Sequence, residues 1–309
     1  MVSFFYFLLS SSLLFANAAV TYEFSGGRFG DCLISYLHAK WFSYKEGIPL
    51  IYKPFVHSTG LVMDEAELRV HPCKSNYSRN YLGRGEVGCG RRTEGTLYIC
   101  PYFPEDVWEL QNTLSLNGEP YYSFPVDWKD EGFREAALAM IAPKRKLQLP
   151  RLQEGAIHVA LHLREGGGFD FDDFRTRFPL KLPPLHFYID GLRAVLELFP
   201  GKKVECHVFT DALNPEALVR QIEEMIPNAQ VQFRFRKGGN HFNRNVLEDF
   251  FSLFLFDVLI RPQSNFSMIP SLLKDYAVVY SPKECSIQEG VVRIEEVSLE
   301  INRERYERL

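Results

Sequence analysis

The sequence predicts an α/β protein with two Rossmann-like domains whose parallel sheets face each other across a cleft. In the C-terminal half, short apolar runs rich in β-branched residues alternate strictly with segments of helical spacing, which is typical of a parallel sheet covered on both faces. The chain has 309 residues, of which 46% are apolar and 24% are charged. This balance is that of a soluble globular protein, and the length indicates two domains. The net charge of −4 does not favour nucleic-acid binding.

The N-terminal half opens with the same alternation of apolar runs and helical spacing. Its expected elements are a strand at 20–24, a glycine-rich turn at 25–31, a helix at 32–47, a strand at 48–55 and, after a loop-rich stretch, a helix at 131–143. The last of these leads into a basic, proline-containing connector. We therefore expect one domain at 19–150 and a second at 151–309.

The C-terminal half gives the clearer pattern. We expect strands at 156–164, 203–211, 229–236, 258–262 and 276–282, and helices at 185–199, 214–226, 245–257, 267–275 and 298–309. Asn214 followed by Pro215 is typical of a helix start, because asparagine caps free backbone N–H groups and proline fits the first helical position.

Residues 2–18 carry no charge and form a mostly apolar run that is short for a membrane span. Ala16, Asn17 and Ala18 have the small-residue character of a signal cleavage site, although no positive segment precedes the run. We interpret residues 1–18 as a signal peptide, with an uncleaved membrane anchor as the second interpretation and a buried first element as the third. Either of the first two places the protein in an exported compartment, such as a periplasm or the ER or Golgi lumen.

The six cysteines include no Cys-x-x-Cys pair and no cluster with zinc spacing. Cys32 and Cys206 lie in apolar patterns and are expected to be buried thiols. Cys73, Cys89 and Cys100 share a polar, glycine-rich stretch, where one disulfide would suit an exported protein. The pairing stays open, and Cys285 is a distant alternative partner.

Chemistry is expected at the carboxyl ends of the parallel strands, where open α/β sheets bind ligands. The strand at 156–164 delivers His162 and Arg164, followed by Glu165 and three glycines. An arginine fork suits phosphate oxygens, and glycines let a ligand approach the backbone. An equally good interpretation is an ion pair of Arg164 with an aspartate of 170–173, beside a flexible turn.

Two further strand ends carry polar residues. Asp211 follows the strand at 203–211 and either binds a ligand or starts the next helix, the second being favoured. Ser264, Asn265 and Ser267 lie where a helix begins, and helix N-termini attract anions. Plain N-capping would need only one of these three, so the group favours a phosphate site.

The acidic run Asp170, Phe171, Asp172, Asp173 admits two interpretations. It is either a carboxylate site for Mg²⁺ or, as we favour, a loop that folds over the ligand. The turn at 26–31 lacks the G-x-G-x-x-G spacing of a dinucleotide site, and its Arg28 is expected to face the cleft.

Four segments together resemble GDP-fucose-dependent fucosyltransferases, a group that includes α1,2-, α1,6- and protein O-fucosyltransferases. They are "GGRFGDCLISYLHAKWF", "HLREGG", "VFTDA" and "VLIRPQSNFSMIPSLL", and they occur in the family's order over residues 25 to 273. Glu165 stands where the family has a second arginine, Asp31 where asparagine is usual, and "MIPSLL" where a tryptophan pair is common.

The resemblance implies a GT-B-like fold, an acceptor-side N-terminal domain, a C-terminal domain that binds the nucleotide sugar, and catalysis without metal or any cofactor beyond the donor. It implies that Arg164 binds the β-phosphate, that His162 supports it and that Asp211 lies near the ribose or guanine. Phosphate or nucleoside contacts would come from Ser264, Asn265 and Ser267, and the cleft lining from Gly27, Arg28, Gly30 and Asp31.

The acceptor would be a hydroxyl group of a glycan or glycoprotein. Its general base would be one of the carboxylates Glu165, Asp170, Asp172 and Asp173. Two alternatives stay open: a metal-dependent sugar-nucleotide transferase that uses residues 170–173, and a non-catalytic nucleotide- or sugar-binding protein of the same fold.

Overall fold

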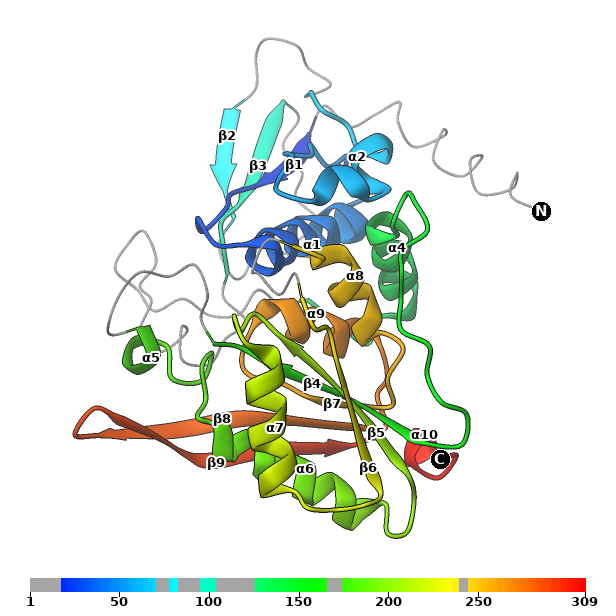
Figure 1. Cartoon of the computed structure of the whole chain (residues 1–309). Coiled ribbons are helices and arrows are strands. Elements are labelled where there is room, and N and C mark those ends of the chain that lie inside the picture. Colours follow the sequence, from blue (N-terminus) through cyan, green and yellow to red (C-terminus); the bar gives the residue numbers. More distant parts are fainter. Residues whose placement is uncertain (1–17, 71–77, 83–94, 104–125, 166–173, 239–243) are drawn as a thin grey trace. The chain divides into compact units, whose positions relative to one another are not determined.

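The computed structural model describes residues 18–70, 78–82, 95–103, 126–165, 174–238 and 244–309. These residues form two compact units, one that ends at Lys146 and one that begins at Leu147 (Figure 1). Each unit contains a sheet of parallel strands with helices, so the predicted α/β class is confirmed. A cleft between facing sheets stays a prediction.

The first unit contains a small parallel sheet with the strand order β1-β3-β2. Its strands are β1 (Ala19–Tyr22), β2 (Ser78–Tyr81) and β3 (Thr96–Cys100), and its helices are α1 (Phe29–Glu46), the short 3-10 helix η2 (Ser58–Gly60), α2 (Met63–Ala66) and α4 (Glu131–Ile141). All of β1 is buried, and α1 buries Leu33, Ile34 and Leu37 completely. The core of this unit therefore lies where α1 covers the sheet.

Two predictions for this unit need correction. Helix α1 begins at Phe29, three residues before the predicted start, because the Arg28 backbone N–H donates to the Asp31 carboxylate at 3.1 Å and so caps the first turn. The predicted strand at 48–55 is wrong. Only isolated bridges form there, at Leu50 and Ile51, and Pro54 has no N–H with which to continue a ladder.

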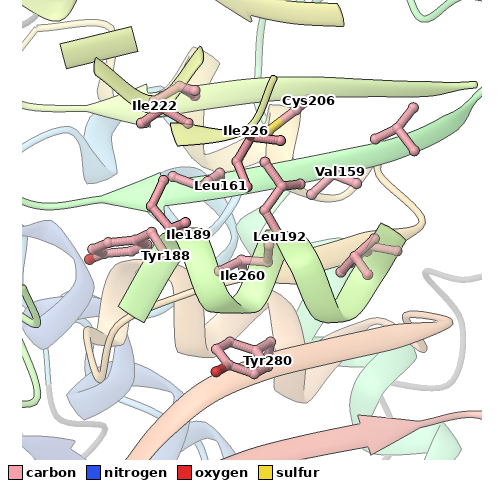
Figure 2. Packing of buried hydrophobic residues seen from close by; sticks show 14 of the residues in the cluster. Val159, Leu161, Tyr188, Ile189, Leu192, Cys206, Ile222, Ile226, Ile260 and Tyr280 are labelled. Carbon is pink, nitrogen blue, oxygen red and sulfur yellow. The ribbon is translucent and has the colours of Figure 1, made fainter. Parts of the chain in front are cut away.

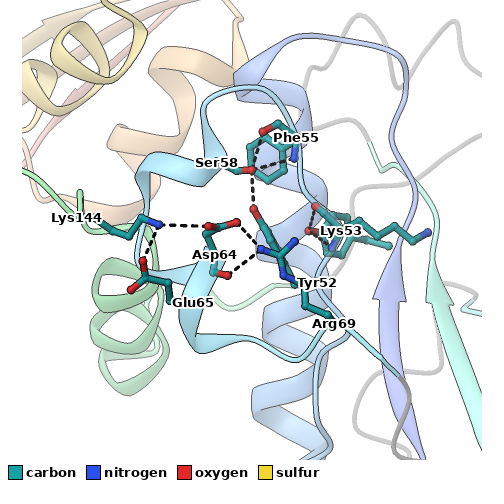
Figure 3. A network of polar contacts seen from close by, with 9 residues as sticks. Tyr52, Lys53, Phe55, Ser58, Asp64, Glu65, Arg69 and Lys144 are labelled. Carbon is teal, nitrogen blue, oxygen red and sulfur yellow. Dashed lines mark hydrogen bonds and ion pairs between the residues drawn. The ribbon is translucent and has the colours of Figure 1, made fainter. Parts of the chain in front are cut away.

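Polar contacts hold the segment that replaces this strand (Figure 3). The Tyr52 hydroxyl donates to the Ser58 hydroxyl at 2.6 Å, and the Arg69 guanidinium lies over the Tyr52 ring at 4.8 Å. Asp64 accepts from Arg69 at 2.6 Å and from Lys144 at 3.2 Å. These contacts join the irregular backbone after Tyr52 to the end of the unit at Lys144.

The second unit contains a six-stranded sheet with the order β6-β5-β4-β7-β8-β9. Its strands are β4 (Ile157–Leu163), β5 (Val204–Thr210), β6 (Val231–Phe235), β7 (Val258–Ile260), β8 (Val278–Gln288) and β9 (Val291–Ile301), and its helices are α5 (Phe174–Arg177), α6 (Leu185–Leu198), α7 (Pro215–Met225), α8 (Val246–Leu253), α9 (Asn265–Leu273) and α10 (Arg303–Tyr306). The pairs from β6 to β8 are parallel, as predicted, and β9 is antiparallel to β8.

The main core lies between the sheet and helices α6 and α7 (Figure 2). Leu161 of β4 and Ile189 and Leu192 of α6 are fully buried there, and each such side chain contributes roughly 1.5–3 kcal/mol. Gly191 permits the close approach of α6, because a Cβ at this position would lie 2.6 Å from the Tyr280 ring. The other face carries a smaller cluster that includes Leu253, Phe256 and Tyr276.

The predicted C-terminal helix at 298–309 is wrong. Residues 291–301 form β9, and only the short α10 follows. Glu289 and Gly290 both have positive φ, at 52° and 76°, and two such residues make a tight hairpin turn whose twist suits the flanking strands. Because this turn reverses the chain, β8 and β9 extend as one long hairpin (Figure 1).

Smaller differences concern helix ends and cysteines. Helix α8 ends at Leu253 instead of 257 and α9 begins at Asn265 instead of 267, whereas Asn214 caps α7 as predicted by accepting from the Ala217 N–H at 3.1 Å. Among the described residues, Cys32, Cys100, Cys206 and Cys285 are not in disulfides. Cys206 is buried as predicted, and Cys32 is only half-buried. Cys73 and Cys89 lie outside the described residues.

None of the helices in the described part of the chain combines the length and apolarity needed to cross a bilayer. Of the predicted signal peptide at 1–18, residues 1–17 lie outside that part.

Candidate functional site

The sheet of the second unit brings several predicted site residues to one edge. Strands β5, β4 and β7 are neighbours, with Leu163 opposite Thr210 and Leu161 opposite Ile260. Asp211 therefore follows β5 beside the end of β4, where Arg164 emerges. Helix α9 begins at Asn265, only a short turn after β7 ends. The strand ends and the start of α9 together form the candidate site.

His162 is the buried centre of this site. Its Nδ1 lies 2.7 Å from the Ser267 hydroxyl oxygen, and its ring lies 5.4 Å from the Phe266 ring. Burial, followed by the positive charges of Arg164 and Arg261, lowers the pKa of His162 to about 3. At neutral pH the ring is therefore uncharged, and it joins the end of β4 to the first turn of α9.

Asp211 and Glu165 are connected through the backbone. The Asp211 carboxylate accepts from the Glu165 backbone N–H at 2.6 Å, and the Glu165 carboxylate pairs with the Arg175 guanidinium at 2.9 Å. Asp211 thus fixes the direction in which the chain leaves Arg164. The predicted contact of Asp211 with a ribose or base, and of Arg164 with a phosphate, stays a prediction.

The start of α9 differs from a simple capped helix. Ser264 occupies the N-cap position, but its side chain makes no capping hydrogen bond. Its carbonyl oxygen accepts from the N–H groups of Ser267 and Met268, at 3.0 and 2.8 Å. Asn265 is buried in the first turn, with 3% of its surface exposed. Ser264 and Asn265 are therefore polar side chains at the positive end of a helix, and capping does not account for Ser264.

Sequence reasoning overlooked three residues of this region. Arg261 directly follows β7, and Arg175 forms the ion pair with Glu165 described above. The Tyr188 hydroxyl of α6 is buried near the backbone of Arg164, and burial raises its pKa. It lies on the side of the core toward which β4 runs (Figure 2). Arg261 could have been found by the criterion that selected Arg164, since each follows a buried strand.

The glycine-rich segment of the first unit has local structural roles. A Cβ at Gly27 would lie 2.2 Å from an Asp31 carboxylate oxygen, so this residue must be small. Gly30 is buried in the first turn of α1, where Asp31 caps the Arg28 N–H. Arg28 is half-buried. That Gly27, Arg28, Gly30 and Asp31 line a cleft stays a prediction.

Part of the predicted site cannot be placed. The three glycines at 166–168 and the carboxylates Asp170, Asp172 and Asp173 lie outside the described residues. Within the ranges that the structure describes, no group of three or more His, Cys, Asp and Glu side chains could hold a metal ion. The interpretation of 170–173 as a metal site is therefore untested.

No protein-family model matches the chain, and no curated protein sequence matches it. Solved structures that it is similar to include the fucosyltransferase NodZ from Bradyrhizobium, POFUT1 and Arabidopsis thaliana FUT1. NodZ from Bradyrhizobium is 14% identical, with 93% of this chain and 99% of NodZ covered and a TM-score of 0.46. POFUT1 with GDP-fucose is 12% identical over 86% and 96% of the two chains, at 0.46. Arabidopsis thaliana FUT1 with GDP is 13% identical over 87% and 72%, at 0.48.

Proposed function

We propose that this protein is a glycosyltransferase that moves fucose from GDP-fucose to a hydroxyl group of a glycan or protein, without a metal ion. The observation that carries the proposal is the position of Arg164 at the end of β4, beside the uncharged His162 that is bonded to Ser267 at 2.7 Å. Arg164 thus lies two residues after the contact that holds β4 against the N-terminal turn of α9. A guanidinium and a helix N-terminus are two groups that stabilise phosphate charge in proteins.

The chemistry of sugar transfer explains why such a site is sufficient. When the bond from the sugar to the diphosphate breaks, negative charge develops on the leaving phosphate. Preorganised positive groups that meet this charge lower the barrier. Arg164 would bind the β-phosphate, while His162 holds Ser267 and the first turn of α9 in place. Asp211 would orient the ribose or guanine, and a carboxylate would take the proton from the acceptor hydroxyl.

The sugar and the base rest on the four segments that resemble fucosyltransferases. The experiment that tests them is donor turnover in the absence of acceptor, with GDP-fucose and GDP-mannose compared by release of GDP. We expect faster hydrolysis of GDP-fucose. Equal or faster hydrolysis of GDP-mannose would remove fucose from the proposal, and binding of GDP-fucose without any turnover, with or without acceptors, would favour the non-catalytic alternative.

The proposed absence of a metal has its own test. Because Arg164 and the start of α9 carry the charge in this proposal, turnover should survive EDTA. Activity that EDTA abolishes, and that Mn²⁺ or Mg²⁺ restores, would instead support the alternative in which residues 170–173 bind a metal.

We further propose that residues 1–18 direct the protein into an exported compartment and are then removed. Strand β1 begins at Ala19, so this cleavage would leave the strand complete. N-terminal sequencing of protein from its native source should begin near Ala19. A chain that retains Met1 in the membrane fraction would favour the anchor, and one that retains it in the cytosol would contradict export.

A further inference from the structure

Arg261 lies next to His162 in the sheet. Leu161 pairs with Ile260 on the neighbouring parallel strand, so the residues that follow them, His162 and Arg261, are adjacent. The Arg261 backbone N–H still donates to the Tyr280 carbonyl at 2.9 Å. The extended pairing with β8 therefore continues through Arg261, although β7 itself ends at Ile260.

The two neighbours also leave the sheet on the same side. Leu161 and Ile260 belong to the core under α6 and α7, whereas Ala160 and Leu259 belong to the cluster on the opposite face. Because successive side chains of a strand alternate between faces, His162 and Arg261 point toward the face with Ala160 and Leu259. This is the face that carries Phe266 of α9.

The electrostatic surroundings agree with this placement. After burial, the charges of Arg164 and Arg261 are the two further causes that lower the pKa of His162. Arg261 also counteracts the burial that raises the pKa of the Tyr276 hydroxyl on the same face. The charges of two half-buried guanidinium groups thus help to keep one buried imidazole ring uncharged. Such like charges repel each other, and a phosphate group bound between them would relieve the repulsion.

We propose that Arg261 is a second phosphate-binding residue, which contacts the β-phosphate of a nucleoside diphosphate together with Arg164. This inference rests on the proposed function, because it assigns a further residue to the same nucleotide site. The competing explanation is structural. The Arg261 side chain donates to the Pro262 carbonyl at 3.3 Å, and this contact would stabilise the turn between β7 and α9 with or without a ligand.

The number of phosphates on the ligand separates the two explanations. A residue that binds the second phosphate should matter for GDP and hardly at all for GMP. A residue that only supports the turn should affect both ligands alike. Removing a charge-assisted hydrogen bond typically weakens binding by roughly ten- to a hundredfold.

The experiment is isothermal titration of GDP and GMP into the full chain and its Arg261→Gln, Arg261→Lys and Arg220→Gln variants. Arg220 is an exposed arginine of α7 that pairs with Glu216, and it serves as the matched control. We expect Arg261→Gln to weaken GDP roughly ten- to a hundredfold, with GMP unchanged within about twofold and Arg261→Lys between the two. Arg220→Gln should bind both nucleotides as the unmodified protein does.

Equal losses for GDP and GMP in Arg261→Gln, or no loss for either, would overturn the inference. If the Gln variant does not fold, the Lys variant decides. Its melting temperature should be unchanged, and its affinity must fall more for GDP than for GMP. An unmodified protein that binds GDP, together with variants that bind it equally well, would refute only the role of Arg261. An unmodified, folded protein that binds no GDP would refute the proposed function itself.

Discussion

The Nδ1 atom of His162 lies 2.7 Å from the hydroxyl oxygen of Ser267, and both residues are buried. They are 105 positions apart in the chain, so this contact fixes the end of β4 against the first turn of α9. Burial keeps the imidazole uncharged. The candidate site therefore combines a neutral, hydrogen-bonded interior with cationic side chains at its border.

The first prediction concerns the pH dependence of stability. The folded-state pKa of His162 is lowered to about 3 from 6.5, so between these values the unfolded chain binds a proton that the folded chain does not. Stability from this residue is fully present above pH 6.5 and is lost as the pH falls toward 3. Urea unfolding measures the free energy of unfolding between pH 4.5 and 6.5. We expect this free energy to rise with pH less steeply in His162→Gln than in the unmodified protein, by about 1 kcal/mol per pH unit. His186→Gln, at an exposed position of α6, is the control, and equal slopes in the unmodified protein and His162→Gln would refute the burial argument.

The second prediction concerns Arg164. Lysine keeps the positive charge but loses the planar fork that binds two phosphate oxygens at once. Arg164→Lys should fold with an unchanged melting temperature and turn over GDP-fucose about a hundredfold more slowly, which corresponds to about 3 kcal/mol in the barrier. Steady-state release of GDP measures this. Kinetics close to those of the unmodified protein would mean that Arg164 has a structural role only.

The third prediction separates two candidate bases. The Glu165 carboxylate is paired with Arg175 at 2.9 Å, so one of its two oxygens is already occupied by a hydrogen bond from the guanidinium. We therefore expect Asp170→Asn to lower kcat by roughly a hundredfold or more and Glu165→Gln to lower it far less. Transfer to an acceptor is measured for both variants. A larger loss in Glu165→Gln would identify Glu165 as the base.

The fourth prediction concerns the packing of α6. A Cβ at Gly191 would lie 2.6 Å from the Tyr280 ring and 3.2 Å from Ile260. Gly191→Ala should lower the free energy of unfolding by about 1–3 kcal/mol, because an overpacked core must shift. Gly132→Ala in α4 is the control, since the atom closest to its added methyl group would be the hydroxyl oxygen of the exposed Tyr44 side chain, at 2.6 Å, which can move aside. Chemical denaturation compares the two variants, and an unchanged Gly191→Ala would refute the close contact.

Much of the second unit follows from sequence because its central strands β4 and β7 are buried on both faces and α7 has a clear cap in Asn214. The β8–β9 hairpin does not, because Glu289 and Gly290 lack the Asn-Gly signature of such a turn and the charged residues after Ser298 have helical spacing. The strand expected at 48–55 does not form, because side-chain contacts of Tyr52 and Asp64 hold that segment instead. Their partners, such as Lys144, lie far away in the sequence or follow no regular spacing, so the sequence does not indicate these contacts.

The candidate site also contains residues that the sequence indicates and residues that it does not. The positions of Arg164 and Asp211 after buried strands were predictable, and their roles stay predictions. Arg261 was counted inside the strand expected at 258–262, although β7 ends at Ile260. Tyr188 has the spacing of a core residue on α6, and nothing in the sequence indicates that its hydroxyl reaches the end of β4. The pairing of Glu165 with Arg175 also depends on tertiary structure alone.

We propose that the carboxyl edge of the second unit's sheet binds a guanine nucleotide through its phosphates. Isothermal titration of the full chain with GDP, UDP, CDP and ADP tests it most directly. We predict that GDP binds with at least tenfold higher affinity than the other three, and that Arg164→Gln abolishes most of this binding without unfolding the protein. A preference for UDP, or a folded protein that binds none of the four nucleotides, would contradict the account.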